Sequence, residues 1–416
     1  MLFRSAIDAV AALPLRADGF RGAIHFRAGT YELARQVRIT AGGIVLRGDG
    51  TGPEGTHFRA TGTKQYDLIQ FSGAGGVKLD EATRRRVVDS YVPIGATRVQ
   101  VAAGHAFRAG DWVVVHHQPT EAWIELLGMA KYGWKASGYQ HQAERRVTRV
   151  EGDTVHLDAP IIEPVDPRYG RASLVRIASS GRIEQCGIEH LRLTSRHASE
   201  TDEQHGWRGV VFHHVKNAWA RHVVVQFFGY AAVSISSTSC LWITVEHCQM
   251  LDPKSEPKGG RRYSFPINGQ RCLVQHCLTR GGRHDFVSGA RSPGPNVYHA
   301  CLATEVVPNN DSGPHHRWNI GTLYDRIVSN MDLNVINRTS SGTGHGWTGA
   351  QIVLWNCTVR RALVQDPPGP FTNWAIGTVG EVGHVSRYSS EAPAVFESNG
   401  TPIADIPSLF EAQRRD

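Results

Sequence analysis

Short apolar runs alternate with glycine-containing turns from the start of the chain. Ile24–Phe26, Val37–Ile39 and Ile44–Leu46 are rich in β-branched and aromatic residues, and Gly-Thr, Gly-Gly and Gly-Asp-Gly turns separate them. Such runs predict short β-strands. Strands this short, with no long helices between them, do not build a doubly wound sheet. The pattern therefore predicts an all-β protein.

One amphipathic helix is expected ahead of the first strand. Ser5 is a favourable N-cap residue, and Ile7, Val10 and Leu13 follow it with the spacing of one helix face. We expect a short N-terminal capping helix over Ser5–Leu13.

Similar short strands recur through the second half of the chain, and cysteines mark one position in them. The distance from Cys248 to Cys277 is 29 residues, from Cys277 to Cys301 it is 24, and from Cys301 to Cys357 it is 56, which is two steps of 28. A repeat of this length is typical of a solenoid. In a parallel β-helix neighbouring coils lie about 4.8 Å apart, so equivalent positions stack in columns.

The seven cysteines fit buried thiols better than disulfides or a metal cluster. Their number is odd, and no Cys-x₂-Cys pair occurs. A buried cysteine behaves as a small apolar residue. We expect the four recurring cysteines to line the interior of the solenoid.

The N-terminal segment resembles a known family. The stretch HFRAGTYEL, the VRI that follows it and the GGIVLRGDG turn are similar to the opening coils of the pectin-lyase-like superfamily. The resemblance covers residues 5–75 and, more loosely, 180–380. It implies a right-handed parallel β-helix and is consistent with a polysaccharide lyase.

One segment breaks the rhythm of the coils. Residues 81–178 contain β-rich runs and a short helical stretch, EAWIELLGMA. We expect four parts, which are an N-terminal cap with the first coils (1–80), an inserted β-rich subdomain able to wall a cleft (81–178), the main parallel β-helix with an active-site face (179–380), and a C-terminal cap or tail (381–416).

Composition and charge narrow the classes of partner that the protein could bind. No apolar run approaches the ~20 residues that a membrane helix requires. The net charge of +7 favours a polyanion, although the excess of arginine, with only seven lysines among 45 cationic residues, also arises in GC-rich genomes. No nucleic-acid-binding motif or basic tail is present. We expect an acidic polysaccharide as partner, and neither nucleic acid nor a membrane.

Four polar clusters next to glycines follow one another at roughly the coil period. The steps from Arg262 to His284, to His316 and to His345 are 22, 32 and 29 residues. Stacked coils would bring the clusters onto one face. The clusters are Arg261–Arg262–Tyr263, Arg283–His284–Asp285, His315–His316–Arg317–Trp318, and Arg338 with His345 and Trp347.

These residue types suit β-elimination in a uronate-containing polysaccharide. Removal of the proton α to a carboxylate requires that the carboxylate charge be neutralised, by arginine or by bound Ca²⁺, and it requires a base and an acid. We expect catalytic roles for the members of this list: Arg262, Arg317 and Arg338 as neutralisers, His284 or His316 as base, Tyr263 or His345 as acid, Asp285 as the group that orients a histidine, and His315 in the same cluster.

Other residues are candidates for substrate binding. Arg261 and Arg283 would contact the acidic chain, and four tryptophans could stack on sugar rings. The tryptophans are Trp318 and Trp347 in the clusters and Trp123 and Trp134 in the insertion. The stretch around Trp123 equally fits a core helix with a capping loop.

Two alternatives to a lyase stay open. A glycoside hydrolase on the same scaffold would need two carboxylates, for which Asp285, Glu305, Asp311 and Asp325 are candidates. Gly344-His345-Gly346 matches one polygalacturonase motif, but the Asp-Asp pair and the Arg-x-Lys of that family are missing. A protein that binds polysaccharide without cleaving it is the third class. Zinc is disfavoured, because the adjacent histidine pairs lack zinc-site spacing.

The first residues bear on localisation. MLFRS resembles the translation of a sequencing adaptor, so we expect a truncated metagenomic gene. A missing signal peptide is then uninformative, and we expect a secreted or periplasmic protein.

Overall fold

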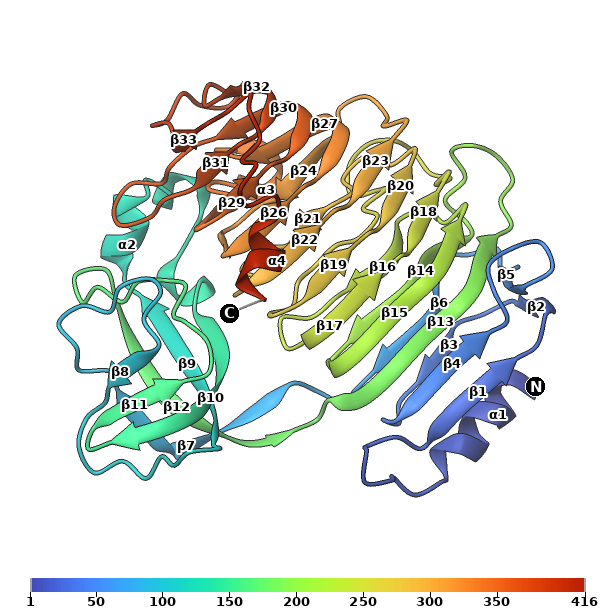
Figure 1. Cartoon of the computed structure of the whole chain (residues 1–416), viewed down its shortest axis with the longest axis horizontal. Helices are drawn as coiled ribbons and strands as arrows, with labels where there is room; N and C mark the ends of the chain where they lie inside the picture. The colour runs from blue at the N-terminus through green and yellow to red at the C-terminus, as the bar shows by residue number, and fades with distance from the viewer. Residues whose placement is uncertain (1, 415–416) are drawn as a thin grey trace.

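The chain folds as a right-handed parallel β-helix with a subdomain inserted at its side (Figure 1). The computed structural model describes residues 2–414. Each coil contributes short strands whose backbone groups pair with the coils before and after it. Parallel strands of one sheet are joined by right-handed crossovers. The fold expected from the strand pattern and the repeat is confirmed.

The first face of each coil is a strand that pairs in parallel with its neighbours in register. Thr244 lies beside Leu273, and Leu273 lies beside Val297. The strands of this face are β1 (Gly22–Phe26), β4 (Ile44–Gly48), the first halves of β13 (Ile183–Ser195) and β15 (Val215–Gln226), β17 (Leu241–Glu246), β19 (Leu273–Gln275), β22 (Asn296–His299), β26 (Thr322–Asp325), β29 (Val353–Trp355), β31 (Trp374–Ile376) and β33 (Val395–Glu397).

The second and third faces complete each coil. The second face holds β2 (Gly29–Leu33), β5 (Thr56–Ala60), the second halves of β13 and β15, β18 (Gln249–Leu251), β20 (Leu278–Arg280), β23 (Leu302–Thr304), β27 (Val328–Val335), β30 (Thr358–Val364) and β32 (Val379–Gly383). The third face holds β3 (Val37–Ile39), β6 (Tyr66–Ser72), β14 (Gly206–His213), β16 (Ala231–Ile235), β21 (Val287–Ser288) and β24 (Asp311–Pro314), with the short pair β25 (Asn319–Ile320) and β28 (Gly349–Ala350) beyond them.

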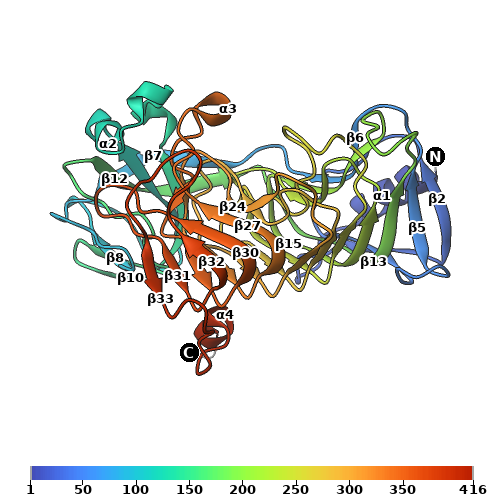
Figure 2. The same ribbon diagram turned by 90° about the horizontal axis from the view of Figure 1, so that it is seen from above.

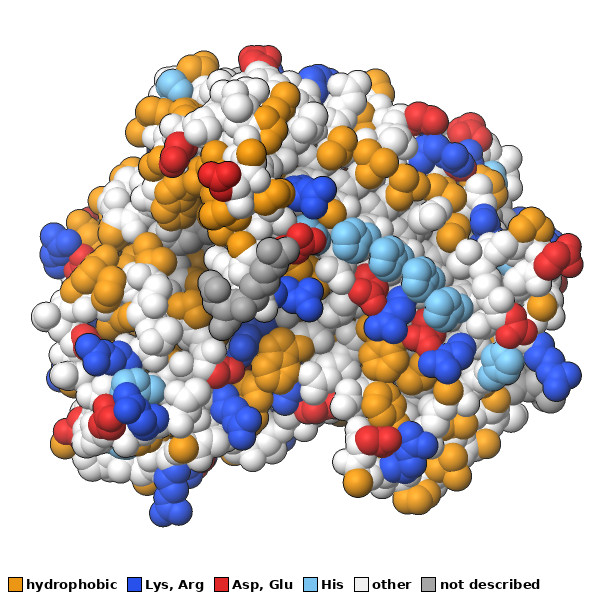
Figure 3. Space-filling view, viewed as in Figure 1, with side chains coloured by type: hydrophobic (Ala, Val, Ile, Leu, Met, Phe, Trp, Pro, Cys, Tyr) orange, Lys and Arg blue, Asp and Glu red, His pale blue; other side chains and the backbone are white. Residues whose placement is uncertain are grey.

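One residue with left-handed backbone geometry marks the bend between the first two faces in successive coils. His190, His222, His247 and His276 occupy this position, with φ between 49° and 57°. Histidine tolerates this conformation better than most residues with a side chain. Their imidazoles stack in parallel at 4.9, 4.9 and 5.1 Å between ring centroids. We call this column the histidine ladder, and Figure 3 shows it as a pale blue row.

The interior holds the expected column of thiols. Cys248, Cys277, Cys301 and Cys357 each follow a bend residue and are buried and free. Ile327 takes the same place after the bend at Arg326, which explains the double step in the cysteine spacing. Burial as free thiols is confirmed.

Helix α1 (Leu2–Ala11) covers the first coil. Its Ile7 is buried, and the Phe3 ring stacks on Phe26 with 4.6 Å between centroids. The helix is as expected, but its bounds differ. Because it begins at Leu2, Ser5 is not its N-cap, and Leu13 lies beyond its end and is exposed.

The inserted subdomain is a six-stranded antiparallel sheet with its own core, and it stands beside the solenoid (Figure 1). Val113, Val147 and Leu174 are fully or almost fully buried in that core. Its elements are β7 (Val77–Arg86), β8 (Arg98–Gln100), β9 (Trp112–Pro119), α2 (Glu121–Leu126), the 3₁₀ turns Ala130–Tyr132 and Ala136–Gly138, β10 (His141–Glu151), β11 (Thr154–Leu157) and β12 (Gly170–Ser180).

The C-terminal segment returns across the first face. Its helix α4 (Leu409–Gln413) projects from the body of the solenoid in Figure 2. The buried Asp325 carboxylate accepts hydrogen bonds from the Ser408 hydroxyl and the Phe410 backbone N–H. Among residues 2–414, none of the helices has the length and apolarity to cross a membrane.

Candidate active site

Stacking of the coils gathers the polar clusters near the corner between the second and third faces. Tyr263, His284 and His315 come from three consecutive coils. The ring centroids of Tyr263 and His284 lie 4.6 Å apart, and those of His284 and His315 lie 4.8 Å apart. Side chains up to 52 residues apart in sequence are therefore in direct contact.

A hydrogen-bonded chain runs from Tyr263 to Arg338. The Tyr263 hydroxyl lies 3.1 Å from Nε2 of His315, and Nη1 of Arg338 lies 3.2 Å from Nδ1 of the same ring. A guanidinium can only donate, so Nδ1 accepts and the ring proton sits on Nε2. Nε2 then donates to the Tyr263 oxygen, which leaves the tyrosine proton free for another acceptor.

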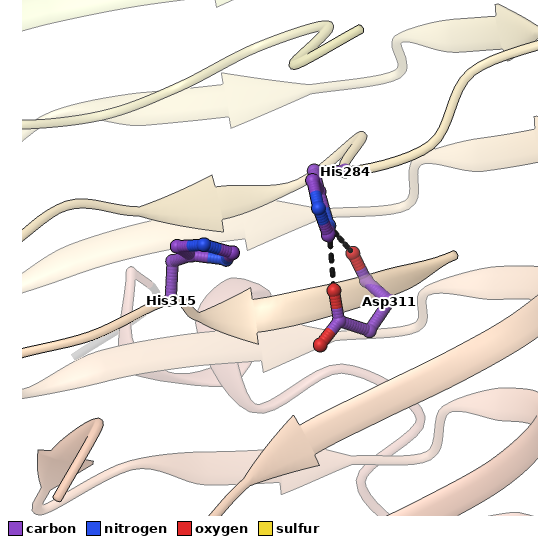
Figure 4. A group of neighbouring side chains, drawn as sticks. All are labelled: His284, Asp311 and His315. Carbon is purple, nitrogen blue, oxygen red and sulfur yellow. Dashed lines mark hydrogen bonds and ion pairs between the residues drawn. The ribbon is translucent and has the colours of Figure 1, made fainter. Parts of the chain in front are cut away.

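His284 and Asp311 form a second pair beside this chain (Figure 4). Nδ1 of His284 lies 2.5 Å from Oδ1 of Asp311 and 2.9 Å from the Asp311 backbone oxygen. Oδ2 of Asp311 lies 3.5 Å from Arg338. When the ring is neutral and Nδ1 donates to Asp311, Nε2 of His284 is its acceptor.

The charges of this group follow from burial and its neighbours. Burial would raise the pKa of Asp311, but His284 and Arg338 hold it well below its usual range. Burial, His284 and Arg338 together hold the pKa of His315 well below its usual value, so this imidazole is neutral. Burial raises the pKa of Tyr263, so its hydroxyl keeps its proton.

An arginine-rich cavity of about 400 Å³ adjoins the group. It is lined by five arginines and two aspartates, namely Arg283, Arg338, Arg360, Arg361, Arg387, Asp311 and Asp332, together with His284, Tyr388 and other residues. Both aspartates are already paired, Asp332 with Arg360 at 2.9 Å and with Arg361 at 2.5 Å. The cavity therefore carries an excess of positive charge.

Several cluster arginines have partners elsewhere. The Arg262 guanidinium is buried and donates to the backbone oxygens of Ser255 and Gly281, at 2.6 and 3.3 Å. Arg261 pairs with Glu203 at 2.7 Å, and Arg317 donates to Thr343. The expected role of Arg262 as a carboxylate neutraliser is wrong, because its guanidinium holds two backbone segments together.

Asp285 does not orient a histidine, contrary to expectation. It is fully buried on the interior side of the coil, where it accepts a hydrogen bond from the Ser264 hydroxyl. Burial raises its pKa to about 6. Successive residues of an extended chain point to opposite sides, so Asp285 faces inward while His284 faces the site. Asp311, one coil further on, takes the expected place.

His316 and His345 lie on the far side of His315. Their ring centroids are 4.9 Å apart, and each is about 5.5 Å or less from the centroid of His315. Burial first, and then neighbouring positive charges, lower the pKa of His316 to about 3 and that of His345 to about 4. Both rings are neutral near pH 7.

The four tryptophans expected to bind sugar are buried instead, at 0–4% exposure. Trp318 and Trp347 of the coils and Trp123 and Trp134 of the insert share one apolar cluster. The Trp123 and Trp318 rings meet edge to face, with 4.9 Å between centroids. The alternative interpretation of the stretch around Trp123 as core is correct, and the same burial holds for the other three rings, which have no surface to offer a sugar.

The group His284, Asp311 and His315 could also hold a metal ion, since its ligand atoms lie within 4.8 Å of one another. Two imidazoles and one carboxylate suit a transition metal and not Ca²⁺, which prefers oxygen ligands. Arg338 approaches both His315 and Asp311 and opposes a cation there. The donor set therefore does not fit Ca²⁺, which was the alternative to arginine for neutralising the carboxylate.

Comparison with known proteins yields only remote likenesses. No protein-family model matches the chain, and no curated protein matches it. The tailspike protein gp49 of Pseudomonas phage LKA1 is similar over 95% of this chain and 73% of its own, with 12% identity and a TM-score of 0.37. The tailspike of E. coli bacteriophage HK620, in complex with a pentasaccharide, is similar over 91% and 53%, with 10% identity and a TM-score of 0.43.

A third solved structure is the gp54 tailspike of Acinetobacter baumannii bacteriophage AP22, in complex with a capsular saccharide. It is similar over 91% of this chain and 68% of its own, with 11% identity and a TM-score of 0.36. Likenesses this remote leave the site to be interpreted from its own residues.

Sequence reasoning missed part of the cavity. Arg360 and Arg361 stand on β30 directly after the Cys357 bend, and Arg387 and Tyr388 lie in the C-terminal segment. Stacking could have placed the arginine pair in line with the clusters. The C-terminal segment has no repeat, so no sequence signal located it.

Proposed function

We propose that the protein is a polysaccharide lyase that cleaves an acidic, uronate-containing polysaccharide by β-elimination. The observation that carries the proposal is the meeting of two hydrogen-bonded pairs, Tyr263–His315 and His284–Asp311, at the edge of an arginine-rich cavity. β-Elimination needs a neutralised carboxylate, a base and an acid. The site offers a candidate for each.

The cavity suits the uronate carboxylate. Arg283 and Arg338 line it beside His284, and a guanidinium binds a carboxylate through two parallel hydrogen bonds. Neutralising the carboxylate makes the proton on the α carbon easier to remove. Arg360 and Arg361 add positive charge, although Asp332 occupies part of their hydrogen-bonding capacity.

His284 is the proposed base. Asp311 holds Nδ1 of the ring, so Nε2 is free to accept the proton from the α carbon. The ionised Asp311 then stabilises the imidazolium that forms. This pairing favours His284 over His316, which was the other candidate and has no carboxylate partner among the described contacts.

Tyr263 is the proposed acid. As the bond from the neighbouring carbon to the glycosidic oxygen breaks, the Tyr263 hydroxyl donates its proton to the departing oxygen. His315 Nε2–H, held in that tautomer by Arg338, donates to the phenolate that remains. One C–H and one C–O bond break, and a carbon–carbon double bond forms.

A hydrolase is less well supported. It would need one protonated carboxyl near a second carboxylate. The register of β24 and β27 places Asp311 beside Asp332 at the cavity, but both are paired with cationic groups, and the pKa of Asp311 is lowered. Asp285 and Asp325 are buried away from the cavity.

The test is a panel of acidic polysaccharides, digested with and without a chelator. We expect products that absorb ultraviolet light, from the new double bond conjugated to the carboxylate, and no loss of rate with chelator. New reducing ends without this absorbance would indicate a hydrolase. Binding without chain shortening would indicate a non-catalytic protein. Since such polymers lie outside cells, the proposal includes a secreted or periplasmic protein.

A further inference from the structure

The inserted subdomain contacts the coils at the segments that carry the candidate site. Trp134 of the insert donates from its indole N–H to the backbone oxygen of Gly344, at 3.0 Å. In the other direction, Trp347 donates to the backbone oxygen of Leu127, at 3.2 Å. The third indole, Trp318, donates to Oε1 of Glu163 at 2.9 Å. Each contact lies within three residues of His315, Arg317 or His345.

Glu163 differs from the other acceptors because it is a buried charge. Its side chain is 8% exposed, and Oε2 lies 2.7 Å from Nδ1 of His141 and 3.1 Å from Nδ1 of His117. Burial would raise the pKa of Glu163, but the two histidines hold it well below its usual range. The carboxylate thus joins β9 and β10 of the insert to Trp318 of the coils.

An apolar residue would join the same surfaces at no cost in desolvation. Replacing buried ionic groups with apolar residues of similar size is often neutral or stabilising. What a carboxylate adds is direction, because it fixes the rotation of the Trp318 indole through one hydrogen bond. The Trp318 backbone N–H in turn donates to Trp347, and that of Arg317 donates to His345.

We propose that Glu163 is a positioning residue, which holds the segment from His315 to Trp318, and through it His345, in the arrangement that the proposed lyase reaction needs. The role in catalysis rests on the proposed function. The geometric part does not, because Glu163 fixes the segment whatever reaction the site performs. The insert is then a support for the catalytic segment.

The test compares three variants by hydrogen exchange and by kinetics. Trp318→Phe keeps the ring and removes the N–H, and Glu163→Leu removes the charge. Trp123→Phe is the matched control, because Trp123 touches Trp318 edge to face and its own indole N–H meets no acceptor in residues 2–414. Glu163→Gln retains an acceptor oxygen and serves as the conservative variant.

We expect faster amide exchange over residues 315–318 in Trp318→Phe and Glu163→Leu, and kcat lower by about tenfold or more with little change in KM, since small displacements of catalytic groups have effects of this size. Trp123→Phe should change neither the amide exchange nor kcat. Glu163→Gln should have a kcat much closer to that of wild type than Glu163→Leu has. The result is informative even if Glu163→Leu does not fold, because Trp318→Phe breaks the same bond.

Equal exchange in Trp318→Phe and Trp123→Phe would overturn the proposal, and so would equal kcat in an active enzyme. If the wild type cleaves no acidic polymer, the exchange comparison alone decides whether Glu163 holds the segment. Failure of the lyase function and failure of the positioning role are thereby separated.

Discussion

Tyr263 is the residue on which the proposed chemistry depends most. Its hydroxyl receives a hydrogen bond from His315 and keeps its proton because burial raises its pKa. We expect Tyr263→Phe to lower kcat for β-elimination by about 10²–10⁴-fold, the usual contribution of a general acid. Initial rates of ultraviolet-absorbing product check this.

The control is Tyr230→Phe. The Tyr230 ring stacks on Tyr263 with 5.2 Å between centroids, but its hydroxyl is not part of the chain to His315. The variant should keep nearly all activity. Equal losses in the two variants would show that the rings act through packing and that the hydroxyl of Tyr263 is not the acid.

Asp285 gives a prediction about pH and stability. Its pKa is raised by burial from 3.8 to about 6, so the folded protein holds this proton where the unfolded chain has lost it. Stability from this group is present at low pH and is lost as pH rises through about 4 to 6. As pH rises across that window, the free energy of unfolding of Asp285→Asn should therefore increase by about 3 kcal/mol relative to that of wild type.

Urea unfolding of wild type and Asp285→Asn at several pH values measures the difference. Asparagine can still accept the hydrogen bond from Ser264, so the comparison isolates ionisation. A difference in unfolding free energy that does not change with pH would contradict the assignment of a protonated, buried Asp285.

At the scale of elements, the histidine ladder is a repeated bend that carries a titratable ring in four coils. Burial and the neighbouring rings His190 and His247 lower the pKa of His222, and burial, His299 and His247 lower that of His276. The folded state then binds fewer protons than the unfolded chain below the ordinary histidine pKa. The ladder should lose stability as pH falls.

The variant His222→Asn/His247→Asn keeps residues that tolerate left-handed geometry. We expect its Tm to fall less than that of wild type between about pH 7.5 and about pH 5. His57→Asn, outside the ladder, is the control for loss of a histidine. An equal fall in Tm with acid in wild type and in the double variant would show that the stacked rings do not cause the loss of stability at low pH.

The elements themselves were largely predictable from sequence. Short strands between glycine turns predicted the all-β coils, and the cysteine spacing predicted the interior column that Cys248 and Cys357 occupy. The bend histidines were not recognised, although His247 and His276 directly precede two of the recurring cysteines, because the sequence does not show which residue of a strand run adopts left-handed geometry. The four tryptophans were expected to bind sugar, but they are buried between insert and coils. Their burial could not be predicted because it depends on how these two separate units pack.

At the scale of the whole molecule, the candidate site forms where the stacked coils and the C-terminal segment meet. Coil stacking predicted which clusters would converge, and the structure places Tyr263, His284 and His315 together. Stacking inferred from the sequence could not predict that Asp311, and not Asp285, faces His284, because that depends on the direction of each side chain. Nor could it place Arg387, which arrives from a segment without a repeat.

The most direct test of the central claim uses an acidic polysaccharide that the protein cleaves. The polymer is digested in ¹⁸O-labelled water, and the oligosaccharide products are measured by mass spectrometry. β-Elimination adds no water, so we predict unsaturated products that contain no ¹⁸O from the cleavage step. One ¹⁸O atom at each new reducing end, incorporated by the cleavage step, would show hydrolysis and contradict the lyase mechanism.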